Sequence, residues 1–131
     1  MHFRLDKQDK YVVINLNEEK LNTLIAAELK SELLLLNSQG FNNIVVDLSS
    51  SKYCDSSGLS AILVGNRLCR NANGFFILSG LSDSVLKLVQ ISQLDKVLNI
   101  TESSAEAVEH ILLSESEKNQ DKEVERNIKN N

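Results

Sequence analysis

The residues with the clearest chemical potential lie in the short segment 55–58, an aspartate, two serines and a glycine. The segment follows the apolar run 44–48, which is typical of a strand, and precedes 59–72, which is typical of a helix. Asp and Ser side chains accept hydrogen bonds from the unpaired N–H groups of a helix start, where the helix dipole also favours negative charge. We therefore expect a helix cap, an exposed hydroxyl that tolerates a phosphate, or both on different serines.

Catalytic and metal-binding alternatives lack the residues that they need. A serine nucleophile requires a base, but His2 and His110 are the only histidines, and no Gly-x-Ser-x-Gly motif is present. Cys54 and Cys69 form no Cys-x-x-Cys pair, and we expect both to be reduced, buried thiols. The sequence also lacks a Gly-x-x-x-x-Gly-Lys-Ser/Thr loop for nucleotide phosphates. We predict no enzymatic activity, no catalytic residue, no metal and no cofactor.

Composition narrows the class of protein further. The chain has 131 residues, of which 42% are hydrophobic, enough for one domain with a core. It carries a formal net charge of −4 and no basic cluster, which argues against direct nucleic-acid binding. No apolar run approaches the roughly 20 residues of a membrane helix, and the first residues lack the apolar stretch of a signal peptide. We therefore predict a cytoplasmic protein that binds neither membranes nor nucleic acids.

Hydrophobic periodicity predicts a single-domain α/β fold. The predicted strands span 3–6, 11–17, 44–48, 75–78 and 97–100, and the first two form a hairpin. The predicted helices span 23–37, 59–72, 82–91 and 103–112. A helix joins the two most apolar strands, which implies a right-handed parallel βαβ unit. We expect a mixed sheet of about four to five strands with parallel central strands, and about four helices that lie mainly on one face.

The composition changes after residue 113. From Ser114 onward acidic and basic residues mix, and Val124 and Ile128 are the only apolar side chains. Burial of so few apolar groups does not offset the entropy cost of ordering a segment. We therefore predict a domain over 1–113 and a charged, flexible C-terminal tail over 114–131, with a solvated helical extension as the alternative.

The segment around the two serines also resembles a known family. The string Val-Val-Asp-Leu at 45–48, followed after a spacer by Cys-Asp-Ser-Ser-Gly-Leu at 54–59, is similar to the core of STAS domains, in particular those of bacterial anti-sigma factor antagonists. The resemblance implies a STAS-like fold over most of the chain. It also implies phosphorylation of Ser56, the serine directly after the aspartate, with Ser57 as the second choice.

The resemblance further implies a partner switch that regulates transcription. In such a switch, the unphosphorylated protein binds an anti-sigma factor serine/threonine kinase, and a sigma factor is released. The kinase then phosphorylates the serine, the complex dissociates, and a serine phosphatase resets the protein. A phosphoserine adds about −1.5 to −2 charge, which would meet the negative charge of Asp55. The alternative is a STAS scaffold or a regulatory subunit of another signalling system, with no phosphorylation switch.

The predicted partner-binding residues lie in two polar segments: Asp55, Ser56, Ser57 and Gly58 in one, and Glu18 and Glu19 in the other. We interpret Gly58 as leaving room for a partner backbone, and Ser57 as doing more of the helix capping than Ser56. The second segment departs from many relatives, which carry a glycine before the glutamate. Here Glu18-Glu19-Lys20 occupies that place with one extra residue.

Overall fold

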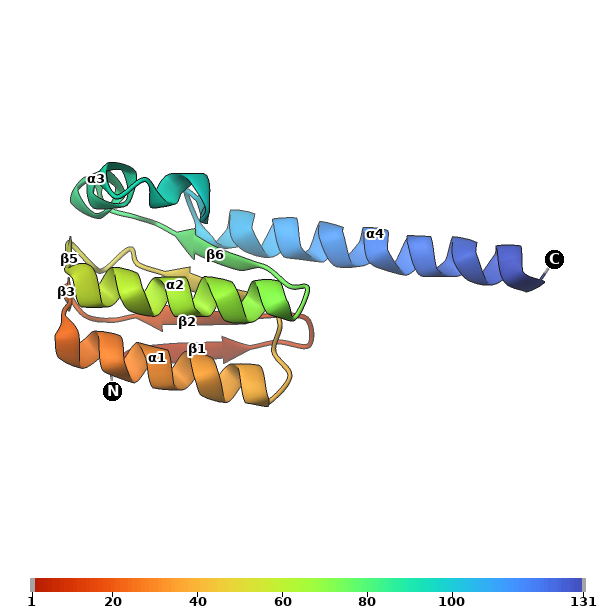
Figure 1. Ribbon diagram of the computed structural model, residues 1–131, viewed down its shortest axis with the longest axis horizontal. Coiled ribbons are helices and arrows are strands. Elements are labelled where there is room, and N and C mark those ends of the chain that lie inside the picture. The colour runs from red at the N-terminus through yellow and green to blue at the C-terminus, as the bar shows by residue number, and fades with distance from the viewer. Residues whose placement is uncertain (1, 131) are drawn as a thin grey trace.

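The computed structural model describes the backbone of residues 2–130 and the side chains of residues 2–118, and five strands form its main sheet (Figure 1). These strands are β1 (Phe3–Lys7), β2 (Val12–Leu16), β4 (Ile44–Asp47), β6 (Phe76–Ser79) and β7 (Asn99–Thr101). They lie in the order β1-β2-β4-β6-β7; β1 pairs antiparallel with β2, and the other neighbours are parallel. The predicted mixed sheet with parallel central strands is confirmed.

The helices lie on both faces of this sheet. α1 (Thr23–Ser38), α2 (Ser56–Asn71) and α3 (Asp83–Ile91) cover one face, where α1 and α2 run side by side (Figure 1). α4 (Ser104–Asn130) packs on the other face through Ala107 and Ile111. The central strands therefore have apolar side chains on both faces, which explains why they read as nearly continuous apolar runs.

Two local features define the start of α1 and the position of α2 on the sheet. Asn22 caps α1, since its side-chain oxygen accepts a hydrogen bond from the Ile25 N–H at 3.2 Å. Gly65 lies in the middle of α2, where a side chain would overlap the buried ring of Phe76. The absence of a side chain at residue 65 therefore lets α2 lie close to β6, and the ring of Phe76 packs directly against this glycine.

Three short elements differ from the prediction. β3 (Lys20–Leu21) and β5 (Tyr53–Cys54) form a separate two-stranded parallel ladder, where the sequence suggested loops. Each strand has two residues, which is too short to produce an alternating pattern. A 3₁₀ turn, η1 (Leu94–Lys96), precedes the last strand, which starts at Asn99 instead of residue 97. α2 starts at Ser56, three residues before the predicted start at residue 59.

α4 is one helix through Asn130, so the backbone after residue 113 continues the helix, and the flexibility predicted for 114–131 stays a prediction. The Asn43 side-chain amide donates to Glu115 Oε1 at 3.1 Å, and Lys118 Nζ donates to the Asn73 carbonyl at 2.9 Å. Contacts with the domain thus continue past residue 113. None of the helices in the described part of the chain has the length and apolarity to cross a membrane.

Removal of residues 119–131 tests whether the end of α4 contributes to the fold. Because Glu115 and Lys118 remain and the deleted segment contains few apolar residues, we expect the melting temperature to stay within a few degrees of the full chain. Circular dichroism of both chains measures this. A drop of more than about 10 °C would show that the end of the helix stabilises the domain.

Candidate functional site

The carboxylate of Asp55 supplies the cap at the start of α2. Asp55 has an extended backbone conformation, and its Oδ1 accepts a hydrogen bond from the Gly58 N–H at 3.0 Å. The sequence predicted that Ser57 would do more of this capping than Ser56, and that prediction is wrong. Ser56 and Ser57 instead form the first two positions of the helix, so their side chains leave from the helix itself.

Ser56 is the more accessible of the two serines. Its residue is exposed, and within the described side chains its hydroxyl has no hydrogen-bond partner. Within the described residues, the backbone N–H groups of Ser56 and Ser57 also have no hydrogen-bond partner. The carboxylate of Asp55 accepts from a different N–H group, that of Gly58. The hydroxyl of Ser56 therefore lies free beside the positive end of the helix dipole.

Ser57 is half-buried and faces the neighbouring helix. Its Oγ lies 3.3 Å from Thr23 Oγ1 in the first turn of α1. The pair stands at the end of a groove of about 440 Å³ between α1 and α2. The groove is lined mostly by small side chains: Thr23, Ala26, Ala27, Lys30, Ser31, Ser57, Ser60 and Ala61. The Ser57 hydroxyl therefore has Thr23 as a neighbour at the groove, whereas the Ser56 residue is more exposed to solvent.

Gly58 faces the interior of the domain. It is buried, and a Cβ at this position would lie 2.6 Å from Cys54 Sγ and 2.8 Å from Leu21 Cγ. Both distances are too short for real side-chain contacts, so only glycine allows the first turn of α2 to rest on the β3–β5 ladder. The position of Gly58 contradicts the interpretation that it leaves room for a partner backbone.

The loop that contains Glu18 and Glu19 lies directly against the segment before Asp55. The carbonyl of Glu19 accepts hydrogen bonds from the N–H groups of Lys52 at 2.8 Å and Tyr53 at 3.2 Å. The side chain of Glu19 is exposed, while that of Glu18 is half-buried, with its Oε1 2.6 Å from His2 Nδ1. The structure thus brings the two predicted segments together at one end of the sheet.

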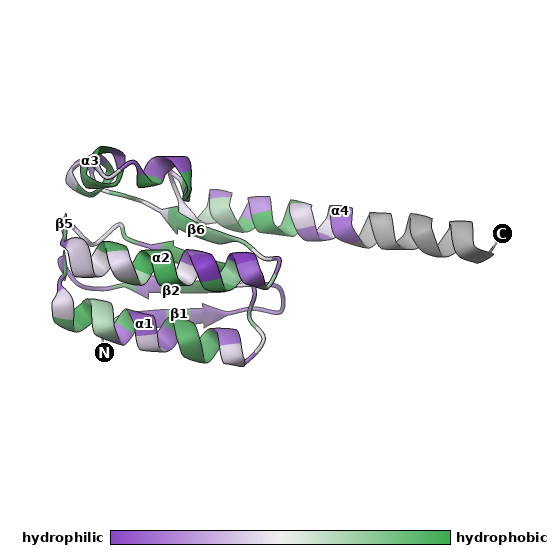
Figure 2. Cartoon of the chain, in the orientation of Figure 1, coloured by the Kyte–Doolittle hydropathy of each residue, from purple (hydrophilic) through white to green (hydrophobic). Residues whose placement is uncertain are grey.

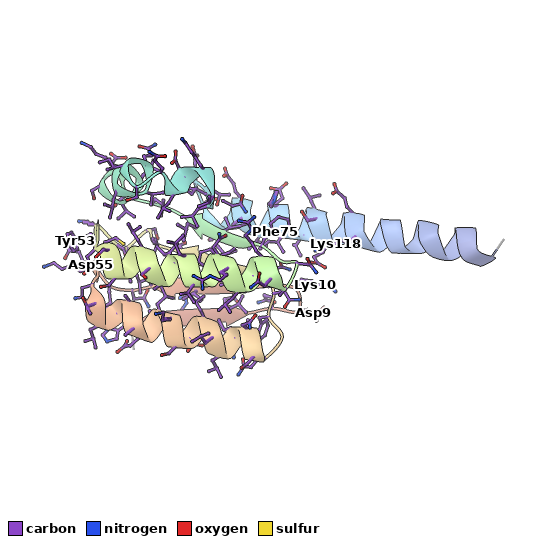
Figure 3. The ribbon with its side chains drawn as sticks, in the orientation of Figure 1. Asp9, Lys10, Tyr53, Asp55, Phe75 and Lys118 are labelled. Carbon is purple, nitrogen blue, oxygen red and sulfur yellow. The ribbon has the colours of Figure 1, made fainter. Side chains whose placement is uncertain are left out.

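Sequence reasoning missed one side chain at this end. Tyr53 is 53% exposed, and its residue pairs with Lys20 in the β3–β5 ladder, directly before the capped turn. Figure 3 shows Tyr53 and Asp55 together at one end of the molecule, with Phe75 and Lys118 toward the other. An exposed aromatic side chain next to a functional motif is a signal for partner contact that the sequence did contain.

Neither histidine is hydrogen-bonded to Ser56 or Ser57 in the described chain, and His2 Nδ1 lies 2.6 Å from Glu18 Oε1 instead. His110 packs edge-on against Phe75, with ring centroids 4.9 Å apart, and Figure 3 shows Phe75 away from the end that carries Asp55. Burial, with a smaller effect of the Asp55 charge, raises the pKa of the Cys54 thiol to about 11, and burial raises that of Cys69 to about 12. Both thiols are therefore protonated near neutral pH. In the described residues, no three metal-ligating side chains converge on one point.

A family model and several solved structures match most of this chain. Residues 2–107 match the family described as STAS domain. A solved structure from Thermotoga maritima, provisionally described as an anti-sigma factor antagonist, is 26% identical, covers 83% of this chain and 93% of its own, and has a TM-score of 0.77.

Two structures of SpoIIAA share the fold. The unphosphorylated form, described as an anti-sigma factor antagonist, is 21% identical over 83% of this chain and 96% of its own, with a TM-score of 0.68. The phosphorylated form from Bacillus is 23% identical, covers 83% of this chain and 98% of its own, and has a TM-score of 0.67.

Replacement of the cap and of its neighbour separates their roles. Asp55→Ala removes the acceptor for the Gly58 N–H, and we expect it to lower the free energy of unfolding by about 0.5–2 kcal/mol. The control Ser57→Ala removes a half-buried hydroxyl that caps nothing, and we expect a change within about 0.5 kcal/mol. Urea unfolding measures both. An equal loss in the two variants would contradict the assignment of the cap.

The buried thiols predict a loss of stability at alkaline pH. Thiols of the unfolded chain ionise near pH 9.0, while Cys54 stays protonated in the fold up to about pH 11 and Cys69 up to about pH 12. Between these values the unfolded state releases protons first, so the free energy of unfolding falls as the pH rises above 9. We expect the double variant Cys54→Ala/Cys69→Ala to lose less stability between pH 8 and pH 10.5 than the wild type. Equal losses would contradict the burial of the thiols.

Proposed function

The chain belongs to the STAS domain family, and we propose that it is an anti-sigma factor antagonist whose binding to a serine/threonine kinase is controlled by phosphorylation of Ser56. The observation that carries the proposal is that different side chains supply the helix cap and the exposed hydroxyl at the start of α2. Asp55 caps the helix, and Ser56 is exposed and its hydroxyl has no hydrogen-bond partner among the described residues. A kinase can therefore modify Ser56 without breaking a contact on which the helix depends.

The fold tolerates a phosphate at this position for an electrostatic reason. The N–H groups of Ser56 and Ser57 are free of partners in the described chain, and the helix dipole is positive at this end. Phosphorylation is then expected to leave the domain folded. Its effect falls on the surface, where the added charge of about −1.5 to −2 meets Asp55 and the nearby loop of Glu19.

The proposed partner surface combines the exposed groups at this end of the molecule. Ser56, Tyr53 and Glu19 are exposed there, and Asp55 is half-exposed. A partner that covers Ser56 must desolvate a phosphate placed on it. A cost of about 3 kcal/mol would weaken binding more than a hundredfold. Gly58 contributes to this surface only indirectly, since it fixes the start of α2 from inside.

The comparisons support the same proposal in coarser form. SpoIIAA, which shares the fold, has been solved in phosphorylated and unphosphorylated forms. We extend that pair of states to this chain at Ser56, with a serine phosphatase restoring the unmodified form, and place the switch in the cytoplasm as part of transcription regulation. A role without enzymatic activity follows from this proposal. The second candidate, a STAS scaffold without a switch, uses the same surface but requires no modification.

Variants at the two serines test the switch. Ser56→Ala should keep the fold and kinase binding but accept no phosphate. Ser56→Asp should stay folded and bind the kinase several-fold more weakly, because one extra charge mimics only part of a phosphate. Ser57→Ala is the matched control, and we expect it to be phosphorylated and to bind as the wild type does.

Calorimetry with an anti-sigma factor kinase from the same organism, together with incorporation of labelled phosphate, measures these outcomes. Phosphate on Ser57 would move the assignment to the second choice. If neither serine accepts phosphate and Ser56→Asp binds as the wild type does, the switch is wrong and the scaffold role takes its place.

A further inference from the structure

β1 lies at the outer edge of the main sheet (Figure 1). Within the described chain, one edge of β1 pairs with β2 and its other edge pairs with no strand. Residues of an antiparallel pair alternate between hydrogen-bonded and non-hydrogen-bonded positions. The Asn17 N–H donates to the His2 carbonyl at 2.9 Å, so even-numbered residues of this strand bond to β2. The backbone N–H and C=O groups of Phe3, Leu5 and Lys7 therefore point to the free edge.

We propose that β1 pairs antiparallel with β1 of a second copy of this chain, in the register centred on Leu5, so that the two sheets join into one. In this register Leu5 lies opposite Leu5, and Phe3 lies opposite Lys7. Phe3, Leu5 and Lys7 then occupy hydrogen-bonded positions on both strands. The N–H and C=O groups that they point to the free edge bond to the same groups of the second copy. The free edge of β1 is thus self-complementary in its backbone.

The charges of β1 fit the same register. Arg4 and Asp6 are both exposed, and they lie on the face of the sheet opposite to α1. In the register centred on Leu5, Arg4 of each copy lies opposite Asp6 of the other, at the non-hydrogen-bonded positions where side chains are closest. Charged side chains on an edge strand often prevent pairing. Here both cross-strand pairs unite opposite charges, which favours pairing with a second copy over pairing with an unrelated strand.

An apolar groove follows the same edge on the other face. It measures about 580 Å³ and is lined by residues of the first strand and of α1: His2, Phe3, Leu24, Ala27, Glu28, Ser31, Glu32 and Leu35. Leu24 is 64% exposed and Leu35 is 50% exposed, and Figure 2 shows hydrophobic bands along the visible side of α1. Opposite residues of an antiparallel pair point to the same face, so both α1 helices flank the junction and the groove of each copy is covered there.

This dimer leaves the candidate site free. Because the two β1 strands run in opposite directions, the ends of the sheets that carry Ser56 lie at opposite ends of the joined sheet. The proposal rests on β1 and α1 alone, so it stands or falls independently of the phosphorylation switch.

Sedimentation of the full, unmodified chain tests whether the dimer forms. We expect a monomer–dimer equilibrium over about 1–500 μM, since one strand pair makes a small interface, with a dimer mass twice the 14.6 kDa of the chain. Hydrogen exchange of the same samples locates the contact. The amides of Leu5 and Lys7 should become protected as the concentration rises, while those of Arg4 and Asp6, already bonded to β2, should change little. A chain that stays monomeric overturns the proposal and leaves this edge to a strand of another protein.

A charge exchange tests the register. Arg4→Asp and Asp6→Arg each turn both cross-strand pairs into like charges, and we expect each to raise the dissociation constant about tenfold or more. The double variant Arg4→Asp/Asp6→Arg restores opposite charges and should return it to within about threefold of the wild type. Circular dichroism confirms that each variant is folded; both residues are exposed, so little change is expected. A dimer that is indifferent to the single reversals, or that the double variant does not rescue, overturns the proposal.

Discussion

The close packing of Gly58 against Leu21 and Cys54 is the constraint on which the rest of the site depends. Because residue 58 has no side chain, the first turn of α2 rests directly on the β3–β5 ladder. That contact holds the loop of Glu19, the segment before Asp55 and the start of α2 in one place. Asp55 can then cap the helix from a fixed position, which leaves Ser56 on the outside.

The sequence predicted the larger elements well because their signals are long. The apolar runs of β4 and β6 are as long as strands, and apolar residues recur at every fourth position of α1 (Ile25, Leu29 and Leu33). The helix between β4 and β6 predicted that these two strands are parallel. The β3–β5 ladder was missed because two-residue strands have no periodicity. The helical form of the segment after residue 113 was only the second choice, because a low apolar content indicates little about an isolated helix.

The sequence predicted a site at the corner before α2, and the structure contradicts two of the roles assigned within it. Asp, Ser and Gly are all common at a helix start, and the residue type alone does not decide which side chain accepts the hydrogen bond that caps the helix. The three-dimensional arrangement decides it: Asp55 precedes the helix, Ser57 faces Thr23, and Gly58 faces inward. The exposed Tyr53 beside them could have been noticed in the sequence, since an aromatic residue directly before such a corner is a feature of contact surfaces.

The central claim is that Ser56 carries a phosphate in the cell, and one measurement addresses it directly. The intact mass of the protein purified from its own host, before and after treatment with a phosphatase, reports whether a phosphate is present, and fragmentation of the peptide containing residues 53–59 locates it. The account predicts a fraction of the protein heavier by one phosphate, lost on treatment and located on Ser56. Protein that carries no phosphate under any growth condition, or carries it elsewhere, would contradict the account.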